Sequence, residues 1–300
     1  PVDLLFNNGT IRKVSSYIDG ENDRWNRYKY LTPVKASGSK KPVICVHPPE
    51  GDSTTYNQIG KYIEKDRPVL AIRFNRKNGE WVHPVDFDQM AERYIKEIVE
   101  YDSKGPYYLL GFCYGGVLAF RMGVMMKEMG HEVRMIMMLD SASKINTKKK
   151  PLERFHIIKQ LFARTKDAIE QNRKLPSGRR FRHVMNKARK VIPRIDSFIM
   201  TRIYWYAANR NNRFLLKVTR GYGALGYSYN LYKPEHFSGR VHYVKALVRA
   251  RQNQNEKYWE QFADEYELFK MDCKHHDIII GEHSKTFVKY LMKVLEDADA

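Results

Sequence analysis

The sequence has little cysteine and no long apolar run, and both absences narrow its class. Only three of the 300 residues are cysteines, namely Cys45, Cys113 and Cys273, and each lies in or beside an apolar stretch. So few cysteines, odd in number, argue against a disulfide framework and predict a reducing, cytoplasmic location. No cysteine or histidine spacing resembles a zinc site, so we expect no bound metal. No run of 18 apolar residues occurs, so we expect no membrane-spanning helix.

The first residues also lack the basic and apolar regions of a signal peptide. The chain begins with Pro1 rather than Met. We therefore expect it to be a piece of a longer chain.

Acidic residues are scarce in one segment, and nearly all of the net positive charge of the chain lies there. Between Lys144 and Arg220 there are 22 Lys or Arg residues and four acids, so this segment holds +18 of the total +19. Its patterns are those of amphipathic helices without strands, which predicts a basic helical insertion at 144–230. Its basic residues could form a solvated face, a docking surface for an acidic partner, or a surface that binds a membrane or nucleic acid. Its aromatic residues are spaced for packing rather than for a lipid surface, and we expect no nucleic-acid partner.

Strand and helix patterns alternate along the rest of the chain. Short apolar runs predict strands at 42–47, 69–74, 107–110, 133–140, 240–248 and 267–271. Helical spacing predicts helices at 54–64, 86–101, 117–129, 256–263 and 282–295. This alternation predicts an α/β fold with a mostly parallel sheet and helices on both faces. We expect an N-terminal extension or linker at 1–41, a core at 42–143 and 231–300, and the insertion between the two core segments.

The segment Gly111-Phe112-Cys113-Tyr114-Gly115-Gly116 joins a predicted strand to a predicted helix. Such a strand–turn–helix junction is the context of a nucleophile elbow, in which a sharp turn exposes the central side chain. The turn requires small neighbours, and Gly111, Gly115 and Gly116 meet this requirement. The central residue is usually serine, whereas here it is Cys113, and a thiol is the stronger nucleophile. A buried packing cysteine is the alternative interpretation.

A nucleophile needs a base, and the base needs an orienting carboxylate. Reactive groups of a parallel sheet gather beyond the carboxyl ends of its strands. Cys113, Asp140 and His275 each stand at such a strand end, in the order nucleophile, acid, histidine. This is the order of the α/β-hydrolase fold, so we predict these three as the catalytic set. His276 competes with its neighbour as the base.

Other residues of the same kind have different expected roles. Asp140 could be only a helix cap, and Asp277 could be the acid in its place. His47 ends the first strand and His283 opens the last helix. We expect a packing role for His47 and a structural role for His283.

An oxyanion hole needs backbone N–H donors near the nucleophile. One donor should be the residue after the nucleophile, Tyr114, and the other should come from the loop after the first strand. Pro48 and Pro49 have no N–H group. We therefore predict Glu50 as the second donor, with Gly51 as the alternative.

These motifs together resemble the thioesterase domains that end polyketide synthase and nonribosomal peptide synthetase chains. The family pairs H-P-x-x-G, G-x-S-x-G-G and L-x-D motifs with a late histidine segment. The matching segments here are Val46–Gly51, Gly111–Gly116, Met138–Ser141, Tyr232–Pro234, Cys273–Ile279 and Gly281–His283. The resemblance covers 42–143 and 232–296, and it favours His275 over His276 as the catalytic histidine. Cys273 stands where the family prefers glycine, and the insertion resembles a long form of the family's lid.

The resemblance implies both a substrate and a mechanism. An acyl or peptidyl chain would arrive as a thioester on the phosphopantetheine of an upstream carrier protein, which could dock at the basic lid. The domain would need no cofactor of its own. Cys113 would take the chain as an acyl-enzyme, and water or a hydroxyl or amine of the chain would then release it.

The thiol adds a hypothesis about how the product leaves. A serine would convert the substrate thioester into a more stable oxoester, whereas Cys113 keeps the acyl group activated. We therefore expect cyclisation or aminolysis more than hydrolysis. A cysteine engineered in place of serine is the alternative to a natural thiol. Alternative functions are a stand-alone cysteine-dependent hydrolase of small esters or lactones, and an inactive, hydrolase-like docking module.

Overall fold

The computed structural model describes residues 27–74, 76–77, 80–81, 87–141, 232–248 and 257–300, together with Thr10, Trp25, Ile203, Tyr206, Arg210 and Tyr229. The chain divides into two compact units, one formed by 1–144 with 228–300 and the other by 145–227. The basic helical insertion predicted at 144–230 falls outside the described residues except for single positions, so it stays a prediction.

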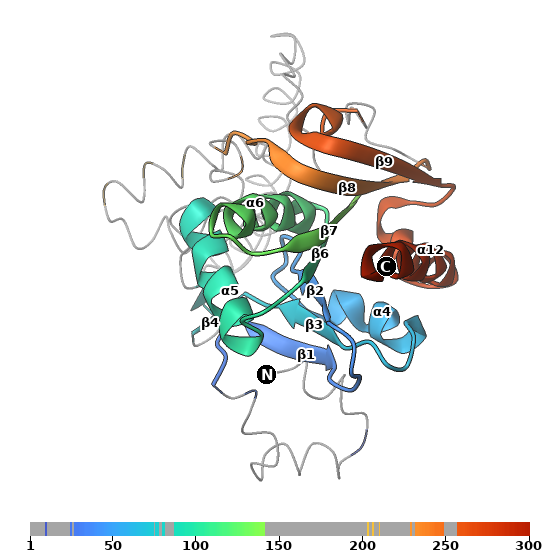
Figure 1. The fold of residues 1–300 in the computed structure, drawn as a ribbon, viewed down its shortest axis with the longest axis horizontal. Coiled ribbons are helices and arrows are strands. Elements are labelled where there is room, and N and C mark those ends of the chain that lie inside the picture. The colour runs from blue at the N-terminus through green and yellow to red at the C-terminus, as the bar shows by residue number, and fades with distance from the viewer. Residues whose placement is uncertain are drawn as a thin grey trace, which may run out of the picture. The chain divides into compact units, whose positions relative to one another are not determined.

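A seven-stranded sheet forms the centre of the first unit (Figure 1). Its strand order is β1-β3-β2-β6-β7-β8-β9. The bounds are β1 (Leu31–Lys35), β2 (Val43–Val46), β3 (Val69–Ile72), β6 (Tyr107–Phe112), β7 (Val133–Leu139), β8 (Phe237–Ala246) and β9 (Ala263–Met271). All neighbours from β3 to β9 run parallel, and β1 is antiparallel to β3. A separate ribbon pairs β4 (Arg76–Lys77) with β5 (Glu80–Trp81).

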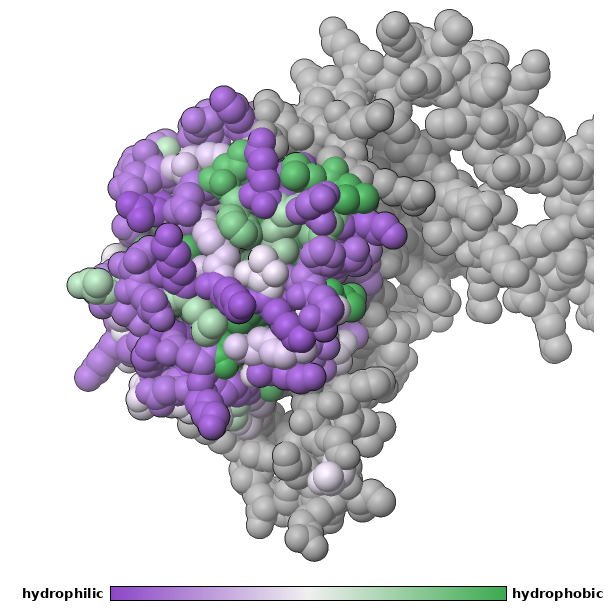
Figure 2. Space-filling view, turned by 90° about the vertical axis from the view of Figure 1, so that its right-hand side faces the viewer, coloured by the Kyte–Doolittle hydropathy of each residue, from purple (hydrophilic) through white to green (hydrophobic). Residues whose placement is uncertain are grey.

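Helices cover both faces of the sheet because its inner strands are apolar on both sides. Every residue of β2, β3 and β6 is buried. One face carries α5 (Phe87–Tyr101) and α6 (Tyr114–Glu128), and the other carries α4 (Asn57–Tyr62) and α12 (His283–Asp299) (Figure 1). A short 3-10 turn, η1 (Thr54–Tyr56), leads into α4. Figure 2 shows a mostly hydrophilic surface on the side of the molecule that faces right in Figure 1.

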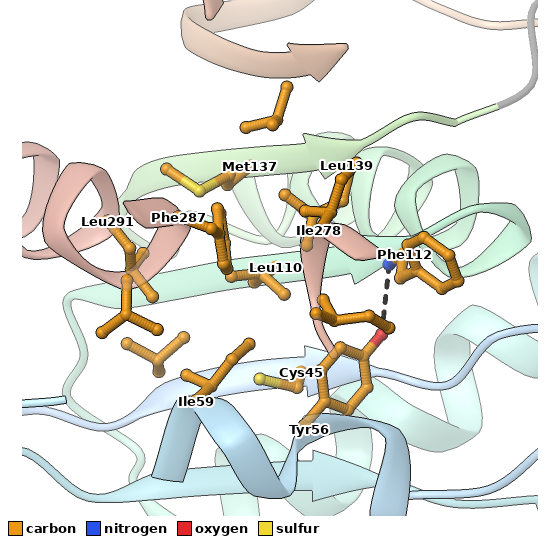
Figure 3. Packing of buried hydrophobic residues seen from close by; sticks show 14 of the residues in the cluster. Cys45, Tyr56, Ile59, Leu110, Phe112, Met137, Leu139, Ile278, Phe287 and Leu291 are labelled. Carbon is orange, nitrogen blue, oxygen red and sulfur yellow. Dashed lines mark hydrogen bonds between the residues drawn. The ribbon is translucent and has the colours of Figure 1, made fainter. Parts of the chain in front are cut away.

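The core between the sheet and the α4–α12 layer reaches the end of β6 that carries the elbow. Figure 3 shows Phe287 and Leu291 of α12 packed toward Leu110 of β6 and Met137 of β7. Tyr56 is fully buried in this core, and its hydroxyl accepts a hydrogen bond of 3.1 Å from the backbone N–H of Phe112. The same hydroxyl donates to the carbonyl oxygen of Val46. The core therefore ties the ends of β2 and β6 together directly beneath the elbow.

The structure confirms the predicted α/β fold and its alternating elements, but it differs at the edges of the sheet. We placed Leu31–Lys35 in the N-terminal extension, whereas it forms edge strand β1. Its short run contains Pro33, which is tolerated at an edge but weakens the strand pattern. The helix predicted at 256–263 is wrong over the described residues. There, Lys257–Trp259 form a turn, and only the 3-10 helix η3 (Glu260–Phe262) follows.

The physical reason for this second difference is the packing of one aromatic residue. Trp259 is 1% exposed, and its ring lies 5.0 Å from the ring of Phe120 on α6. Burying this indole fixes the turn, and β9 then begins at Ala263, four residues earlier than predicted. The predicted loop at 273–277 contains a short 3-10 helix, η4 (His275–Ile278). Among the described residues, we find no helix with the length and apolar character needed to cross a membrane.

Candidate active site

Cys113 lies at a strained turn between β6 and α6. Its backbone φ is 57° and its ψ is −118°, a combination that L-residues rarely adopt. A Cβ atom on Gly111 would lie 2.1 Å from the carbonyl oxygen of Gly115, and one on Gly115 would lie 2.2 Å from that of Val46. One on Gly116 would lie 1.8 Å from the hydroxyl of Ser141. The three predicted glycines therefore allow the close backbone approach that lifts the partly exposed thiol above the sheet.

Asp140 follows β7 at the same edge of the sheet. Its backbone N–H donates to the carbonyl oxygen of Val244 at 2.7 Å, and its φ of 40° turns the chain away from the strand. One carboxylate oxygen, Oδ2, lies 2.6 Å from Nδ1 of His275, which opens η4. The Asp140 side chain is 5% exposed and that of His275 is 23% exposed. The carboxylate is thus enclosed, whereas the imidazole reaches the surface of the site.

The charges of the site are coupled to one another. Burial lowers the pKa of His275, but hydrogen bonds with Asp140 and Cys113 outweigh it and raise this pKa to about 9. Burial raises the pKa of Asp140, but hydrogen bonds from His275 and Lys245 outweigh it and hold this pKa below its usual value. The arrangement therefore favours an ionised carboxylate and a histidine that readily takes a proton.

Of the two adjacent histidines, the first, His275, contacts the carboxylate of Asp140. The ring of His275 lies over Phe112, with centroids 4.4 Å apart. The exposed ring of His276 lies beside these two rings. Its centroid is 5.7 Å from that of Phe112 and 5.0 Å from that of His275. Asp277 turns back along its own helix, where its carboxylate accepts a hydrogen bond from the N–H of Lys274. The structure thus brings together Cys113, Asp140 and His275.

The predicted oxyanion loop is a tight turn after β2. The N–H of Gly51 donates to the carbonyl oxygen of Pro48 at 2.9 Å, so this amide closes the turn. Glu50 is exposed at the tip of the loop. Tyr114 is the first residue of α6, where backbone N–H groups point out of the helix end. The loop geometry therefore favours Glu50 over Gly51 as the partner of Tyr114.

His47 is fully buried behind this loop. Its Nδ1 lies 2.8 Å from the carbonyl oxygen of Pro48, and its Nε2 lies 2.7 Å from the hydroxyl of Tyr94 on α5. Burial lowers the pKa of His47 to about 4. Both ring nitrogens contact groups within the protein, so His47 holds the loop against α5 and does not face a substrate.

Sequence reasoning missed one charged residue of the site, Lys245 of β8. Its Nζ donates to Oδ1 of Asp140 at 2.9 Å, and the Lys245 side chain is only 4% exposed. Two residues earlier on the same strand, the hydroxyl of Tyr243 donates to the carbonyl oxygen of Ser141 at 2.6 Å. The signal in the sequence was a lysine inside the otherwise apolar run Tyr243–Val248, at the end of a buried strand. Over the described part of the chain, no cluster of three or more His, Cys, Asp or Glu residues is arranged to hold a metal.

The thioesterase-domain family model matches residues 41–189, which include the oxyanion loop, the elbow and Asp140. The chain belongs to this family. The thioesterase domain is 31% identical to atromentin synthetase of Tapinella panuoides over 141 residues, which are 45% of the chain and 14% of that protein. It is 26% identical to a dimodular nonribosomal peptide synthase of Bacillus subtilis over 272 residues, which are 89% of the chain and 11% of that protein.

A solved thioesterase domain supports the same fold. The NocB thioesterase domain from the nocardicin cluster superposes with a TM-score of 0.56 at 18% identity, and the match covers 90% of this chain and all of that one. The resemblance to synthetase thioesterase domains that the motifs predicted is therefore confirmed. The chain spans only a small part of the length of the curated relatives named above.

Proposed function

We propose that this thioesterase domain releases an acyl or peptidyl chain from a carrier-protein phosphopantetheine thioester through an acyl-enzyme on Cys113. One observation carries the proposal, namely that Asp140 and His275 join Cys113 at the elbow. The proposal also draws on the relatives, whose names are those of synthetases.

The first chemical step follows from the different positions of the two ring nitrogens of His275. Because Nδ1 of His275 faces Asp140, Nε2 is the nitrogen available to accept the thiol proton. The sulfur of Cys113 then bonds to the thioester carbon, and the bond from that carbon to the pantetheine sulfur breaks. The imidazolium gives its proton to the departing pantetheine thiolate, which leaves as the thiol. The backbone N–H groups of Tyr114 and Glu50 are the proposed donors to the oxyanion.

The second step transfers the acyl group from Cys113 to an acceptor. Water gives hydrolysis, while a hydroxyl or amine of the bound chain gives a ring. His275 takes the proton of the acceptor and then protonates the thiolate that leaves. Because the intermediate is itself a thioester, it keeps the reactivity of the substrate. This supports ring closure or aminolysis as the preferred outcome.

The proposed partner is an upstream carrier protein, and the basic segment Lys144–Arg220 is the proposed docking surface. An acidic carrier would be attracted over distance, and salt would screen that attraction. Binding of a carrier protein should weaken steeply between about 0.05 and about 0.5 M salt. An affinity that stays constant over this range would remove docking at the basic segment from the proposal.

Capture of the acyl-enzyme tests the proposal directly. The domain is mixed with a short acyl-pantetheine thioester, and intact mass with peptide mapping then locates the adduct. We expect the acyl mass on Cys113, its loss in Cys113→Ala, and its retention in Cys45→Ala, because Cys45 is buried in β2. Loss of the adduct in both variants, or its retention in both, would refute the acyl-enzyme on Cys113.

The product ratio tests the role of the thiol. Cys113→Ser would form an oxoester intermediate, which reacts more slowly with amines and hydroxyls. With a substrate that carries an internal nucleophile, we expect a lower fraction of cyclic product from Cys113→Ser than from the unaltered domain. Equal rates and equal product ratios would show that the thiol has no special part in release.

A further inference from the structure

Lys245 is a buried cation that pairs with the carboxylate of the proposed triad. Its Nζ binds Oδ1 of Asp140 at 2.9 Å, while Oδ2 of the same carboxylate lies 2.6 Å from His275. The Lys245 and Asp140 side chains are 4% and 5% exposed. The carboxylate therefore lies between two groups that compete for its negative charge.

Burying a lysine is costly unless a carboxylate compensates for its charge. A core position on β8 would be occupied at lower cost by an apolar side chain, as it is at the neighbouring Val244 and Ala246. Lys245 is thus placed where its charge acts on Asp140 at short range. In such an enclosed site, charges interact more strongly than they do at the surface.

Other ionisable groups lie near the Asp140–His275 pair. Cys113 acts on His275 from the elbow, and Tyr243 acts on Asp140 from β8. Cys273 approaches from the loop after β9, where Asp272 and Asp277 lie nearby. The charged groups that act most strongly on Asp140 in the described residues are therefore Lys245 and His275.

We propose that Lys245 is a positioning residue of the triad, which keeps Asp140 ionised and oriented and which limits the basicity of His275. This inference rests on the proposed function of the triad. The ammonium group fixes Oδ1 and leaves Oδ2 for the imidazole. It also offsets part of the negative charge that would otherwise stabilise the imidazolium.

The partial neutralisation of Asp140 by Lys245 suits a thiol nucleophile better than a hydroxyl nucleophile. A thiol is far more acidic than a serine hydroxyl, so it needs less help from a base. An imidazolium that is less strongly stabilised also returns its proton more readily to a leaving thiol. Lys245 and Cys113 thus form a matched pair, in which Lys245 keeps the basicity of His275 below the level that Asp140 alone would give, and the acidic thiol needs no stronger base.

Titration of His275 by NMR tests the inference without relying on turnover. The signal of His275 is assigned by its disappearance in His275→Gln. In Lys245→Met the cation is lost, so we expect the pKa of His275 to rise by about one unit. Lys245→Gln should raise it similarly, because it keeps a donor to Asp140 without the charge, and it serves if Lys245→Met does not fold.

Two variants separate charge from structure. Lys245→Arg keeps the charge and should leave the His275 titration close to that of the unaltered domain. Tyr243→Phe removes the neighbouring hydrogen bond to Ser141 on the same turn but no charge, so it should not move the titration either. A His275 pKa that stays unchanged or falls in both neutral Lys245 variants would overturn the inference, as would an equal rise in Tyr243→Phe.

A nucleophile exchange tests the matched pair. We measure kcat/KM for the acyl-pantetheine thioester in four proteins: the unaltered domain, Cys113→Ser, Lys245→Gln and the double variant. We expect Lys245→Gln to increase activity severalfold in the Cys113→Ser background and to give no increase when Cys113 is present. The same change in both backgrounds would refute the pairing. Failure of the acyl-enzyme itself would appear separately, as the absence of an adduct on Cys113.

Discussion

Arg67 and Lys245 are both buried cations that pair with carboxylates, but they lie at opposite ends of the parallel strands. Arg67 precedes β3 and is fully buried. Its guanidinium donates to Glu64, to the carbonyl oxygen of Lys41 and to Asp299 of α12, and it lies over the ring of Tyr108 at 5.4 Å. Lys245 is the penultimate residue of β8 and lies beside Asp140, which it shares with His275.

The two ion pairs differ in the contact that the second oxygen of each carboxylate makes. Asp299 completes its contacts within the fold, because its second oxygen accepts a hydrogen bond of 2.7 Å from the hydroxyl of Tyr108. The second oxygen of Asp140 faces a histidine that reaches the surface. The Arg67 cluster therefore fastens the last helix to the sheet, whereas the Lys245 pair leaves one oxygen for the contact with His275. An arginine suits the first task, since its fork of donors can be satisfied at several points.

The largest expected effect comes from removing the structural cation. Arg67→Met leaves the carboxylates of Glu64 and Asp299 without their shared partner, and we expect the free energy of unfolding to fall by about 3–5 kcal/mol. Denaturant unfolding measures this loss. The kcat/KM per folded molecule should stay within about twofold, because the cluster lies away from the elbow. A loss of activity without a loss of stability would contradict this division between the two ends.

Next in size is a matched exchange of the two carboxylates. Asp140→Asn should lower kcat/KM by on the order of 100-fold or more, because the amide no longer stabilises the imidazolium. Asp299→Asn should leave kcat/KM nearly unchanged and cost about 1–3 kcal/mol of stability. Steady-state kinetics and denaturant unfolding of both variants provide the comparison. If the two substitutions lowered activity equally, the proposed separation of roles would fail.

A smaller effect should follow when the arginine becomes a lysine. Arg67→Lys keeps the charge but has too few donors for Glu64, Asp299 and the carbonyl oxygen of Lys41 at once. We expect a cost of about 1–2 kcal/mol in the free energy of unfolding. Thermal and denaturant unfolding measure it against Arg67→Met. Equal stabilities for the two variants would mean that charge contributes nothing to this cluster.

The smallest expected effect is a pH dependence that belongs to the site. The pKa of His275 is raised from 6.5 to about 9, so the folded protein binds this proton more tightly than the unfolded chain does. The resulting stability is fully present below pH 6.5 and is lost as the pH rises through about 9. The difference in unfolding free energy between the unaltered domain and His275→Gln should therefore shrink by on the order of 1 kcal/mol over that window. A difference that is independent of pH would contradict the raised pKa.

Much of the fold could be predicted because its inner strands are short, apolar and bounded by turn residues. β2 and β6 have the apolar runs of strands that are buried on both faces. β1 could not be predicted, since an edge strand with Pro33 has only one partner and lacks a continuous apolar run. The turn at Lys257–Trp259 was missed for a different reason, namely that the burial of Trp259 against Phe120 depends on a helix far away in the sequence.

Some residues of the candidate site could likewise be predicted from the sequence, and one could not. Cys113 could be chosen as nucleophile because glycines on both sides of one polar side chain are a local pattern. Asp140 and His275 could be chosen because each follows a strand, and the strand ends of a parallel sheet meet at one edge. Lys245 could not be assigned a role, because its partner is more than 100 residues away in the chain and depends on the pairing of β7 with β8.

The sequence by itself determined the strand–turn–helix elbow, since the spacing of Gly111, Cys113 and Gly115 is a property of adjacent residues. Only the tertiary structure decided that Asp140 is held between His275 and Lys245, and that Gly51 closes a turn while Glu50 lies at its tip. The physical reason is the separation along the chain over which the deciding interactions act. Backbone conformation depends on near neighbours, whereas the charge and orientation of a buried carboxylate depend on whichever side chains the folded sheet brings within hydrogen-bonding distance.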